Sequence, residues 1–445
     1  MSLIRGAWLC NEGERFFGDL RIREGRIARI APRIEPLPGE TVFEAEGRWL
    51  LPGMIDDQVH FREPGLTHKG DLESESRAAV AGGITSFLEM PNTKPPTLDR
   101  AALLDKYRRA EGRCHANYGF YIGAANDNLS ELLAVDPLLA CGVKIFMGAS
   151  TGNMLVDDPE VLDAIFAKVR LRLITHCEET PRIEANLARL KALHPAGLRP
   201  EHHPLVRDRL ACLASTEKAI ALAKRHDARL HVLHISTADE LALFEPGPIE
   251  GKRITAETCV HFLHFDESDY PRLGNLIKCN PSIKSASDRE ALLKALADRR
   301  LDVLATDHAP HTLEEKQQPY EQAPSGLPLV QHALPAALEP VFSGRISLER
   351  VVELTAHAPA RLFQIEERGF LREGYFADLV LIDPEKPTEV RREALLYRCG
   401  WSPFEGRRFR SSVAATWVNG QLVFDGRKVR EEPAGRRLRW RHRPS

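Results

Sequence analysis

Residues 53–61 read GMIDDQVHF and residues 83–91 read GITSFLEMP, two short and largely apolar runs that each begin with glycine. Runs of this length, bounded by glycine or proline, are typical of strands buried on both faces of a parallel sheet. Between them lies DLESESRAAVAGG (71–83), a helical pattern that opens with aspartate, a favourable N-cap residue. A strand, a helix and a second strand form the repeating unit of an α/β fold.

The same alternation continues downstream. Helical patterns such as DPEVLDAIFAKV (158–169) and DREALLKALADRR (288–300) also open with aspartate. Eight strand and helix units over about 300 residues predict an α/β fold of the (β/α)8 TIM-barrel type. The six further strand runs are ANYGFYIGA (116–124), GVKIFMG (142–148), LRLITHC (171–177), ARLHVLHIS (228–236), RITAETCVHFL (253–263) and LDVLATDHA (301–309).

Both ends of the chain have a different sequence pattern, in which short runs of alternating apolar and polar residues are separated by turn residues. The first 50 residues contain such runs at 20–22 and 26–30, and strand patterns return in ADLVLID (377–383) and ATWVNGQLVFDG (415–426), where Asn419-Gly420 is a hairpin signal. We therefore expect a small β-sandwich domain built from residues 1–50 and 365–445, with the barrel at 51–364. The arginine-rich end, GRRLRWRHRPS (435–445), is expected to be a solvated tail.

The composition of the chain argues against some classes of binding partner. The 445 residues carry 61 Lys and Arg against 63 Asp and Glu, a net charge of −2, which gives no general attraction to nucleic acid or to an anionic membrane. No run is long and apolar enough to span a bilayer, and the first residues lack the features of a signal peptide. Eight widely spaced cysteines without a CxxC pair are expected to be reduced thiols of a cytoplasmic protein.

Polar side chains stand at or near the ends of the predicted barrel strands, where apolar residues are expected. One such histidine is more often an ordinary buried residue than a metal ligand. The carboxyl ends of barrel strands meet on one face, however, so the set predicts a metal site there. Imidazoles with a carboxylate suit zinc. The residues are His60, Asn92, Lys144, His176, His234, Asp307 and His308.

Lys144 is the unusual member, because burial of an ammonium group is costly unless the amine is neutralised or paired. A neutral amine can react with CO2 to give a carbamate, which resembles a carboxylate and can bridge two ions. Carboxylation of Lys144 would thus explain a lysine inside an apolar strand.

These residues belong to motifs that resemble the dihydroorotase family of the amidohydrolase superfamily. They are PGMIDDQVHFREPG (52–65), MPNT (90–93), VKIFMG (143–148), TDHAPH (306–311) and LREGYFADLVLID (371–383). The resemblance covers essentially the whole chain. The HFREPG, PNT and DHAPH combination is specific, whereas the broader pattern is shared with hydantoinases and allantoinases.

The resemblance implies a role for each matching residue. Asp307 would be both a metal ligand and the general acid/base. The implied zinc ligands are His60, Lys144, His176, His234 and Asp307, and the implied substrate contacts are Arg62, Asn92, Asn280, His311, Ser325 and Gly326. Arg62 would pair with the substrate carboxylate, which hydantoins and allantoin lack, and His311 would add a cationic donor. Without these roles, Arg62 would be a surface arginine, Asp307 a helix cap and Asn280 a turn residue.

One position departs from the family pattern. The first histidine of its HxH motif is Gln58 here, and an amide oxygen is a poorer zinc ligand than imidazole. We therefore expect one tightly held zinc ion and a second that is weak or absent.

The implied activity is the reversible cyclisation of N-carbamoyl-L-aspartate to L-dihydroorotate in de novo pyrimidine biosynthesis. A hydroxide activated by the metal would attack the ring carbonyl, with Asp307 moving the proton. Two alternatives stay open: another cyclic amidohydrolase of the hydantoinase or allantoinase kind, and a metal-poor subunit that only scaffolds aspartate transcarbamoylase. A homodimer and an association with aspartate transcarbamoylase are the expected assemblies.

Overall fold

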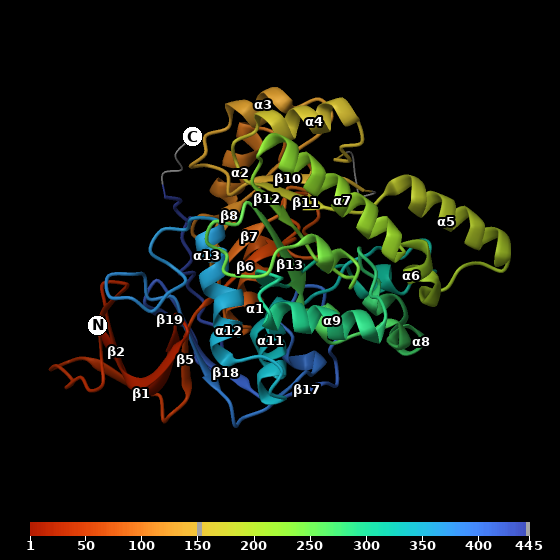
Figure 1. Cartoon of the computed structure of the whole chain (residues 1–445). Helices are drawn as coiled ribbons and strands as arrows, with labels where there is room; N and C mark the ends of the chain where they lie inside the picture. The colour runs from red at the N-terminus through yellow and green to blue at the C-terminus, as the bar shows by residue number, and fades with distance from the viewer. Residues whose placement is uncertain (149–153, 442–445) are drawn as a thin grey trace.

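The computed structural model describes residues 1–148 and 154–441. Its centre is a ring of parallel strands with helices outside (Figure 1), as the alternating sequence pattern predicts. The ring strands are β6 (Met54–Val59), β7 (Ile84–Glu89), β8 (Asn117–Phe120), β9 (Ile122–Gly123), β10 (Val143–Phe146), β11 (Leu173–His176), β12 (Leu230–Val232), β13 (Ile254–Cys259) and β14 (Val303–Ala305).

The ring is continuous. β6, β7 and β8 pair in order, and β9 to β14 pair in order. The third predicted strand is divided into β8 and β9 at Tyr121, whose amide donates to the carbonyl of Glu89 on β7. Between β14 and β6, Val59 bridges His308 in parallel, and the amide of His60 donates to the carbonyl of His308 at 2.7 Å. The (β/α)8 barrel prediction is confirmed.

Helices cover the outside of the ring. The predicted aspartate caps are confirmed at Asp71 and Asp158, and Asp99 caps the helix at residues 100–110 in the same way. Each of the three accepts a backbone hydrogen bond from the first turn. The expected cap at Asp288 is wrong: Ser285 caps α9 (Ala286–Ala297), and Asp288 completes the capping box three residues later. The other main helices are α1 (Leu72–Ala81), α2 (Arg100–Ala110), α3 (Leu129–Ala134), α4 (Pro159–Lys168), α5 (Thr180–Leu193), α7 (Arg209–His226), α11 (Ala333–Phe342), α12 (Leu348–Val352) and α13 (Ala358–Leu362).

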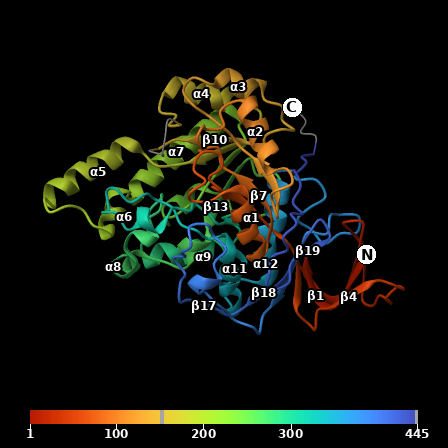
Figure 2. The same ribbon diagram turned by 180° about the vertical axis from the view of Figure 1, so that it is seen from behind.

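The two chain ends share one sheet beside the barrel, with β1 packed near α12 (Figures 1 and 2). β5 pairs with β1 from the first half and β15 from the second, which joins the two ends. Asn419 and Gly420 connect β18 to β19 with φ values of 51° and 75°, as a two-residue hairpin requires. The sheet contains β1 (Ser2–Asn11), β2 (Glu14–Arg23), β3 (Arg26–Ala31), β4 (Thr41–Glu44), β5 (Trp49–Pro52), β15 (Leu379–Asp383), β18 (Ser412–Val418) and β19 (Gln421–Phe424). The predicted β domain from both ends is confirmed, whereas its limits at residues 50 and 365 stay a prediction.

The arginine-rich end is not a free tail as far as residue 441. Leu438 and Trp440 are buried, the amide of Leu438 donates to the carbonyl of Tyr118, and Trp440 lies against Gly119 of β8. The expectation of a solvated tail is wrong for this segment, because apolar residues between the exposed arginines pack on the barrel.

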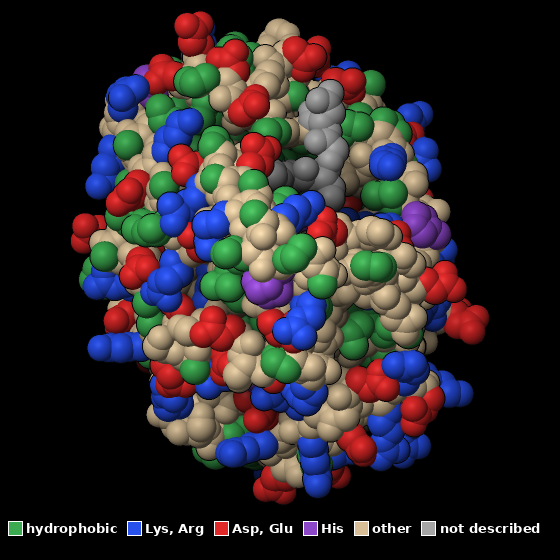
Figure 3. Space-filling view, turned by 90° about the vertical axis from the view of Figure 1, so that its right-hand side faces the viewer, with side chains coloured by type: hydrophobic (Ala, Val, Ile, Leu, Met, Phe, Trp, Pro, Cys, Tyr) green, Lys and Arg blue, Asp and Glu red, His purple; other side chains and the backbone are tan. Residues whose placement is uncertain are grey.

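Basic and acidic side chains are interspersed on the face drawn in Figure 3, as the small net charge leads one to expect. None of the described helices combines the length and hydropathy needed to cross a bilayer.

A buried polar junction ties the barrel to the terminal sheet. The carboxylate of Asp378, just before β15, pairs with Arg368 and accepts from Asn117 Nδ2 at 3.1 Å and from the amide of Asn419 at 2.7 Å. Asp378 and Arg368 are both buried. Removal of the carboxylate would leave Arg368 as a buried charge without its partner.

We therefore expect Asp378→Ala to lower the free energy of unfolding by about 3–5 kcal/mol in urea denaturation followed by fluorescence. Glu389→Ala is the matched control, since Glu389 pairs with Arg391 on the surface, where an ion pair contributes about 0–1 kcal/mol. Equal effects of the two substitutions would contradict the role of the junction.

Candidate active site

A cavity of about 130 Å³ opens at the carboxyl end of the barrel strands. Every residue that the resemblance implied for metal or substrate binding lines it. His308, which the strand-end pattern also predicted for the metal site, does not: its Nε2 donates to Glu75 Oε2 at 2.8 Å, and its Nδ1 accepts from the amide of Leu329. Gln58, Phe146 and Ala309 complete the wall, which otherwise consists of His60, Arg62, Asn92, Lys144, His176, His234, Asn280, Asp307, His311, Ser325 and Gly326. The topology brings these residues together from widely separated segments, while the role of each remains a prediction.

Three of these side chains stand on left-handed backbone. Arg62, His234 and Asp307 have φ values of 70°, 42° and 51°. This region costs a non-glycine residue about 1–3 kcal/mol, and such residues cluster at functional sites. The strain occurs where the chain leaves β6, β12 and β14, so it turns those side chains towards the cavity.

His176 and His234 face each other across the cavity wall, with Nδ1 of His176 2.9 Å from Nε2 of His234. The other ring nitrogen of His176, Nε2, donates to Glu178 Oε2 at 3.0 Å. Nδ1 of His176 therefore carries its lone pair towards His234. Burial lowers the pKa of both histidines, which keeps the rings neutral as metal binding requires.

Glu178 is the residue that fixes this arrangement. It is fully buried and also pairs with Arg207. Burial alone would raise the pKa of Glu178, but the charge of Arg207 and the bond from His176 bring it down to about 2. A permanently ionised carboxylate behind a ligand imidazole fixes the tautomer and orientation of the ring.

Lys144 is buried on β10, and its Nζ makes no hydrogen bond or ion pair in the described part of the chain. Burial lowers the pKa of Lys144 to about 8. A fraction of the amine is then neutral near pH 7, which is the form that reacts with CO2. A buried lysine with a partly neutral amine is compatible with the expected carbamate.

His60 and Asp307 present two acceptors to each other. Nδ1 of His60 donates to Asn92 Oδ1 at 2.7 Å, so Nε2 turns its lone pair towards Asp307 Oδ1, 3.2 Å away. A cation between these atoms would relieve the contact between two acceptors. The residues present thus fit a divalent ion. Asn92 was expected to contact substrate, and its bond to His60 was not predicted.

Gln58 occupies the position of the missing histidine. Its Nε2 donates to Asp307 Oδ1 at 3.1 Å, and its Oε1 lies 3.8 Å from Cys259 Sγ. The amide therefore satisfies Asp307 as a hydrogen-bond donor. This is consistent with the expectation that the second metal position is weak.

Arg62 is buried beside the cavity, so the alternative of a surface arginine is wrong. Its Nε donates to the carbonyl of Pro310, and its Nη2 lies 3.0 Å from Nε2 of His311. No carboxylate pairs with Arg62 among residues 1–148 and 154–441, and burial lowers its pKa to about 10. Burial lowers the pKa of His311 well below its usual range, so the expected cationic donor is instead a neutral imidazole.

The loop with Ser325 and Gly326 closes the cavity. Gly326 has a φ of 143°, and a Cβ there would lie 2.4 Å from the carbonyl oxygen of Ala309, so only glycine fits. Lys316 is buried and donates to the carbonyls of Gly326, Pro324 and Lys278 at 3.0, 2.9 and 3.0 Å. Nothing in the local sequence identifies Lys316 as the residue that holds this loop.

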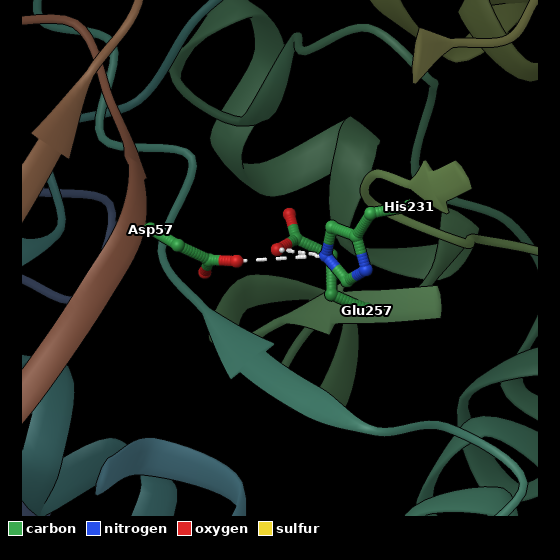
Figure 4. A group of neighbouring side chains, drawn as sticks. All are labelled: Asp57, His231 and Glu257. Atoms are coloured by element: carbon green, nitrogen blue, oxygen red, sulfur yellow. Dashed lines mark hydrogen bonds and ion pairs between the residues drawn. The ribbon is translucent and has the colours of Figure 1, made fainter. Parts of the chain in front are cut away.

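A second group of ligand-type side chains lies elsewhere in the barrel. Asp57, His231 and Glu257 are fully buried, and one ligand atom of each lies within 4.8 Å of the others (Figure 4). The motifs recognised in the sequence did not include this group. The available signal was three ionisable residues inside apolar strand runs, on β6, β12 and β13.

Most of the chain matches known proteins. The model of the amidohydrolase family matches residues 49–423. Dihydroorotase from Halobacterium salinarum is 36% identical over 96% of this chain and 98% of its own length, and dihydroorotase from Bacillus cytotoxicus is 32% identical over 94% and 97%. Among solved structures, L-hydantoinase (dihydropyrimidinase) from Arthrobacter aurescens superposes with a TM-score of 0.92 at 28% identity, covering 98% of this chain and 99% of that chain.

The Glu178 contact predicts a measurable effect. Glu178→Gln should weaken binding of a divalent metal to the cavity about 10–100-fold, because the amide no longer holds the proton on His176 Nε2 as strongly. Zinc titration of the metal-free protein, followed by calorimetry, checks this. The exposed neighbour Glu179 supplies the control, Glu179→Gln, which should bind as the unmutated protein does. Equal affinities for all three proteins would contradict the role of Glu178.

Proposed function

The chain belongs to the amidohydrolase family, with dihydroorotases among its similar relatives, and from this premise we propose that it is a zinc-dependent dihydroorotase. The reaction is the reversible closure of N-carbamoyl-L-aspartate to L-dihydroorotate, a step of de novo pyrimidine synthesis. The observation that carries the proposal is Arg62, a buried guanidinium at the cavity with no carboxylate partner in the described residues. Dihydroorotate brings that carboxylate.

The metal would be held by His176, His234 and carboxylated Lys144, with His60 and Asp307 on the side of the second position. A bound zinc ion supplies Lewis acidity: it lowers the pKa of water and polarises a carbonyl oxygen. Support comes from the neutral imidazoles, from the acceptor contact between His60 and Asp307, and from the lowered pKa of Lys144.

Arg62 binds and orients the substrate in this proposal. Its planar guanidinium can form two parallel hydrogen bonds to a carboxylate, and the bond to Pro310 fixes its orientation. Asn92, Asn280, His311 and the Ser325-Gly326 loop surround the remaining edges of the ring. Oδ1 of Asn280 is buried without a hydrogen-bond partner in the described residues, so it is free to accept from a ring N–H.

Asp307 moves the proton. It takes a proton from the attacking water in the hydrolytic direction and returns it to the leaving ring nitrogen. Gln58 and His60 both reach Oδ1 of Asp307, which leaves Oδ2 for this exchange.

Two other activities are less well supported. The hydantoinase structure shares the fold, but a hydantoin has no carboxylate for Arg62. A subunit that only scaffolds aspartate transcarbamoylase would not need to keep nearly all of the ligand-type residues around one cavity, where only Gln58 departs from the expected set. A dihydroorotase assay with hydantoin and allantoin as competing substrates separates the three. Turnover of dihydroorotate alone supports the proposal, and preference for hydantoin or an inactive protein with zinc bound contradicts it.

The location and the assembly of the protein stay predictions, and we propose a cytoplasmic homodimer. The cytoplasmic location is compatible with the eight cysteines of the described chain, which form no disulfide and seven of which are buried. An association with aspartate transcarbamoylase is the corresponding expectation for a partner.

Arg62→Met should raise KM for dihydroorotate about 30-fold or more, because a buried charge-assisted pair lost in this way costs about 2–5 kcal/mol. Steady-state kinetics measure this. Arg62→Lys keeps the charge without the planar fork and should recover part of the loss. An unchanged KM for Arg62→Met would contradict the assignment of the substrate.

Asp307→Asn should reduce kcat by about 10²–10⁴-fold, since the amide cannot accept the proton. Circular dichroism should show an unchanged fold. A variant with nearly full turnover would show that another residue moves the proton.

Gln58→His should increase the zinc held in the cavity, because an imidazole replaces an amide that donates to Asp307. Anomalous diffraction from crystals of dialysed protein counts the ions in the cavity. We expect one ion before the substitution and two after it. Gln58→Met, which removes the donor without adding a ligand, is the control. Two fully occupied cavity positions in the unmutated protein would refute this expectation.

A further inference from the structure

Asp57, His231 and Glu257 form a cluster inside the barrel that has no part in the proposed reaction. Figure 4 shows the two carboxylates on the same side of the His231 imidazole, with Nε2 directed at both. Nε2 lies 3.2 Å from Glu257 Oε2 and 3.5 Å from Asp57 Oδ2. All three side chains have zero exposure.

Thr255 fixes the tautomer of His231 through the ring nitrogen that points away from the carboxylates. Thr255 Oγ1 donates to the carbonyl of Leu230, and Nδ1 of His231 lies 2.8 Å from that hydroxyl oxygen. The hydroxyl therefore accepts from Nδ1–H, which leaves the lone pair of Nε2 facing the carboxylates. Metal-ligating histidines are oriented by this kind of contact at the other nitrogen.

The carboxylates lack partners of their own. No donor in the described residues hydrogen-bonds to either oxygen of Asp57 or to Oε1 of Glu257. Burial and the nearby charge of Asp57 raise the pKa of Glu257 well above its usual range, so the two acids repel each other in the charged state. Two carboxylates and a neutral imidazole carry a charge that one divalent cation neutralises.

We propose that Asp57, His231 and Glu257 bind a divalent metal ion, of the zinc class, at a closed structural site separate from the catalytic cavity. Zinc bonds of about 2.0–2.2 Å in a tetrahedron place ligand atoms about 3.3–3.6 Å apart, close to the two distances from Nε2. The fourth position falls to one of the oxygens without a partner. Complete burial disfavours magnesium, which keeps several of its waters.

The site would join β6 to two strands, β12 and β13, with which β6 does not pair. Asp57 lies on β6, while His231 and Glu257 lie on β12 and β13, which are separated from β6 by β14. His60 follows Asp57 by three residues and His234 follows His231 by three. An ion here would therefore fix the separation of two strands whose ends carry cavity histidines.

Anomalous diffraction on crystals of the unmutated protein, prepared with zinc and dialysed, tests this directly. Data from both sides of the zinc absorption edge should show a peak among Nε2 of His231, Oδ2 of Asp57 and Oε2 of Glu257. Absence of a peak at this position overturns the proposal, and the carboxyl groups then share protons instead. The outcome does not depend on the substrate, so a failed dihydroorotase assay leaves it unaffected.

Elemental analysis of variants gives a second test. The double variant Asp57→Asn with Glu257→Gln should lose about one zinc ion per chain, whereas His176→Asn should lose only cavity zinc. Glu89→Gln is the matched control, because Glu89 is an equally buried barrel carboxylate that already pairs with Lys106. A folded double variant with unchanged zinc content overturns the proposal. If that variant does not fold, the anomalous peak in the unmutated protein decides alone.

Discussion

Water is excluded from the interior of a closed parallel barrel, so each charged side chain there needs a counter-charge close by. The molecule meets this condition at Glu89, which pairs with Lys106 in the barrel wall. Three other buried side chains, Arg62, Lys144 and Asp57, have no group of opposite charge at hydrogen-bond distance in the described residues. Both ligand sites inferred above consist of groups whose missing partner a ligand would supply.

The position of the cavity follows from the same architecture. Parallel strands place their carboxyl ends on one face, and loops there can carry residues that a packed core would reject. Left-handed backbone at Arg62, His234 and Asp307 turns three side chains into that space. Packing of apolar residues on both sides of the barrel strands offsets the unfavourable free energy of this strained backbone.

The fold could be predicted because its signals are local. Apolar runs, aspartate caps and the Asn419-Gly420 turn each lie within a few residues, and together they determine the order of strands and helices. The gathering of His60, Lys144 and Asp307 around one cavity could also be anticipated, since strand ends of one barrel must meet.

Contacts between distant segments could not be predicted in this way. The hydrogen bond from His176 to Glu178 joins near neighbours in the sequence, but Glu178 also pairs with Arg207, which is distant. Lys316 likewise reaches the carbonyl of Gly326 only in the folded chain. The burial of Trp440 likewise depends on Gly119, far away in the chain. Alternation within a single strand also does not reveal that Asp57 would face His231 across the barrel.

In the proposed reaction, Arg62 selects a cyclic amide that carries a carboxylate. A comparison of dihydroorotate with 5,6-dihydrouracil, which is the same ring without that group, tests this selection most directly. We predict that kcat/KM for dihydroorotate exceeds that for dihydrouracil by about 30-fold or more, the equivalent of a lost buried charge pair. Similar values of kcat/KM for the two compounds would contradict it.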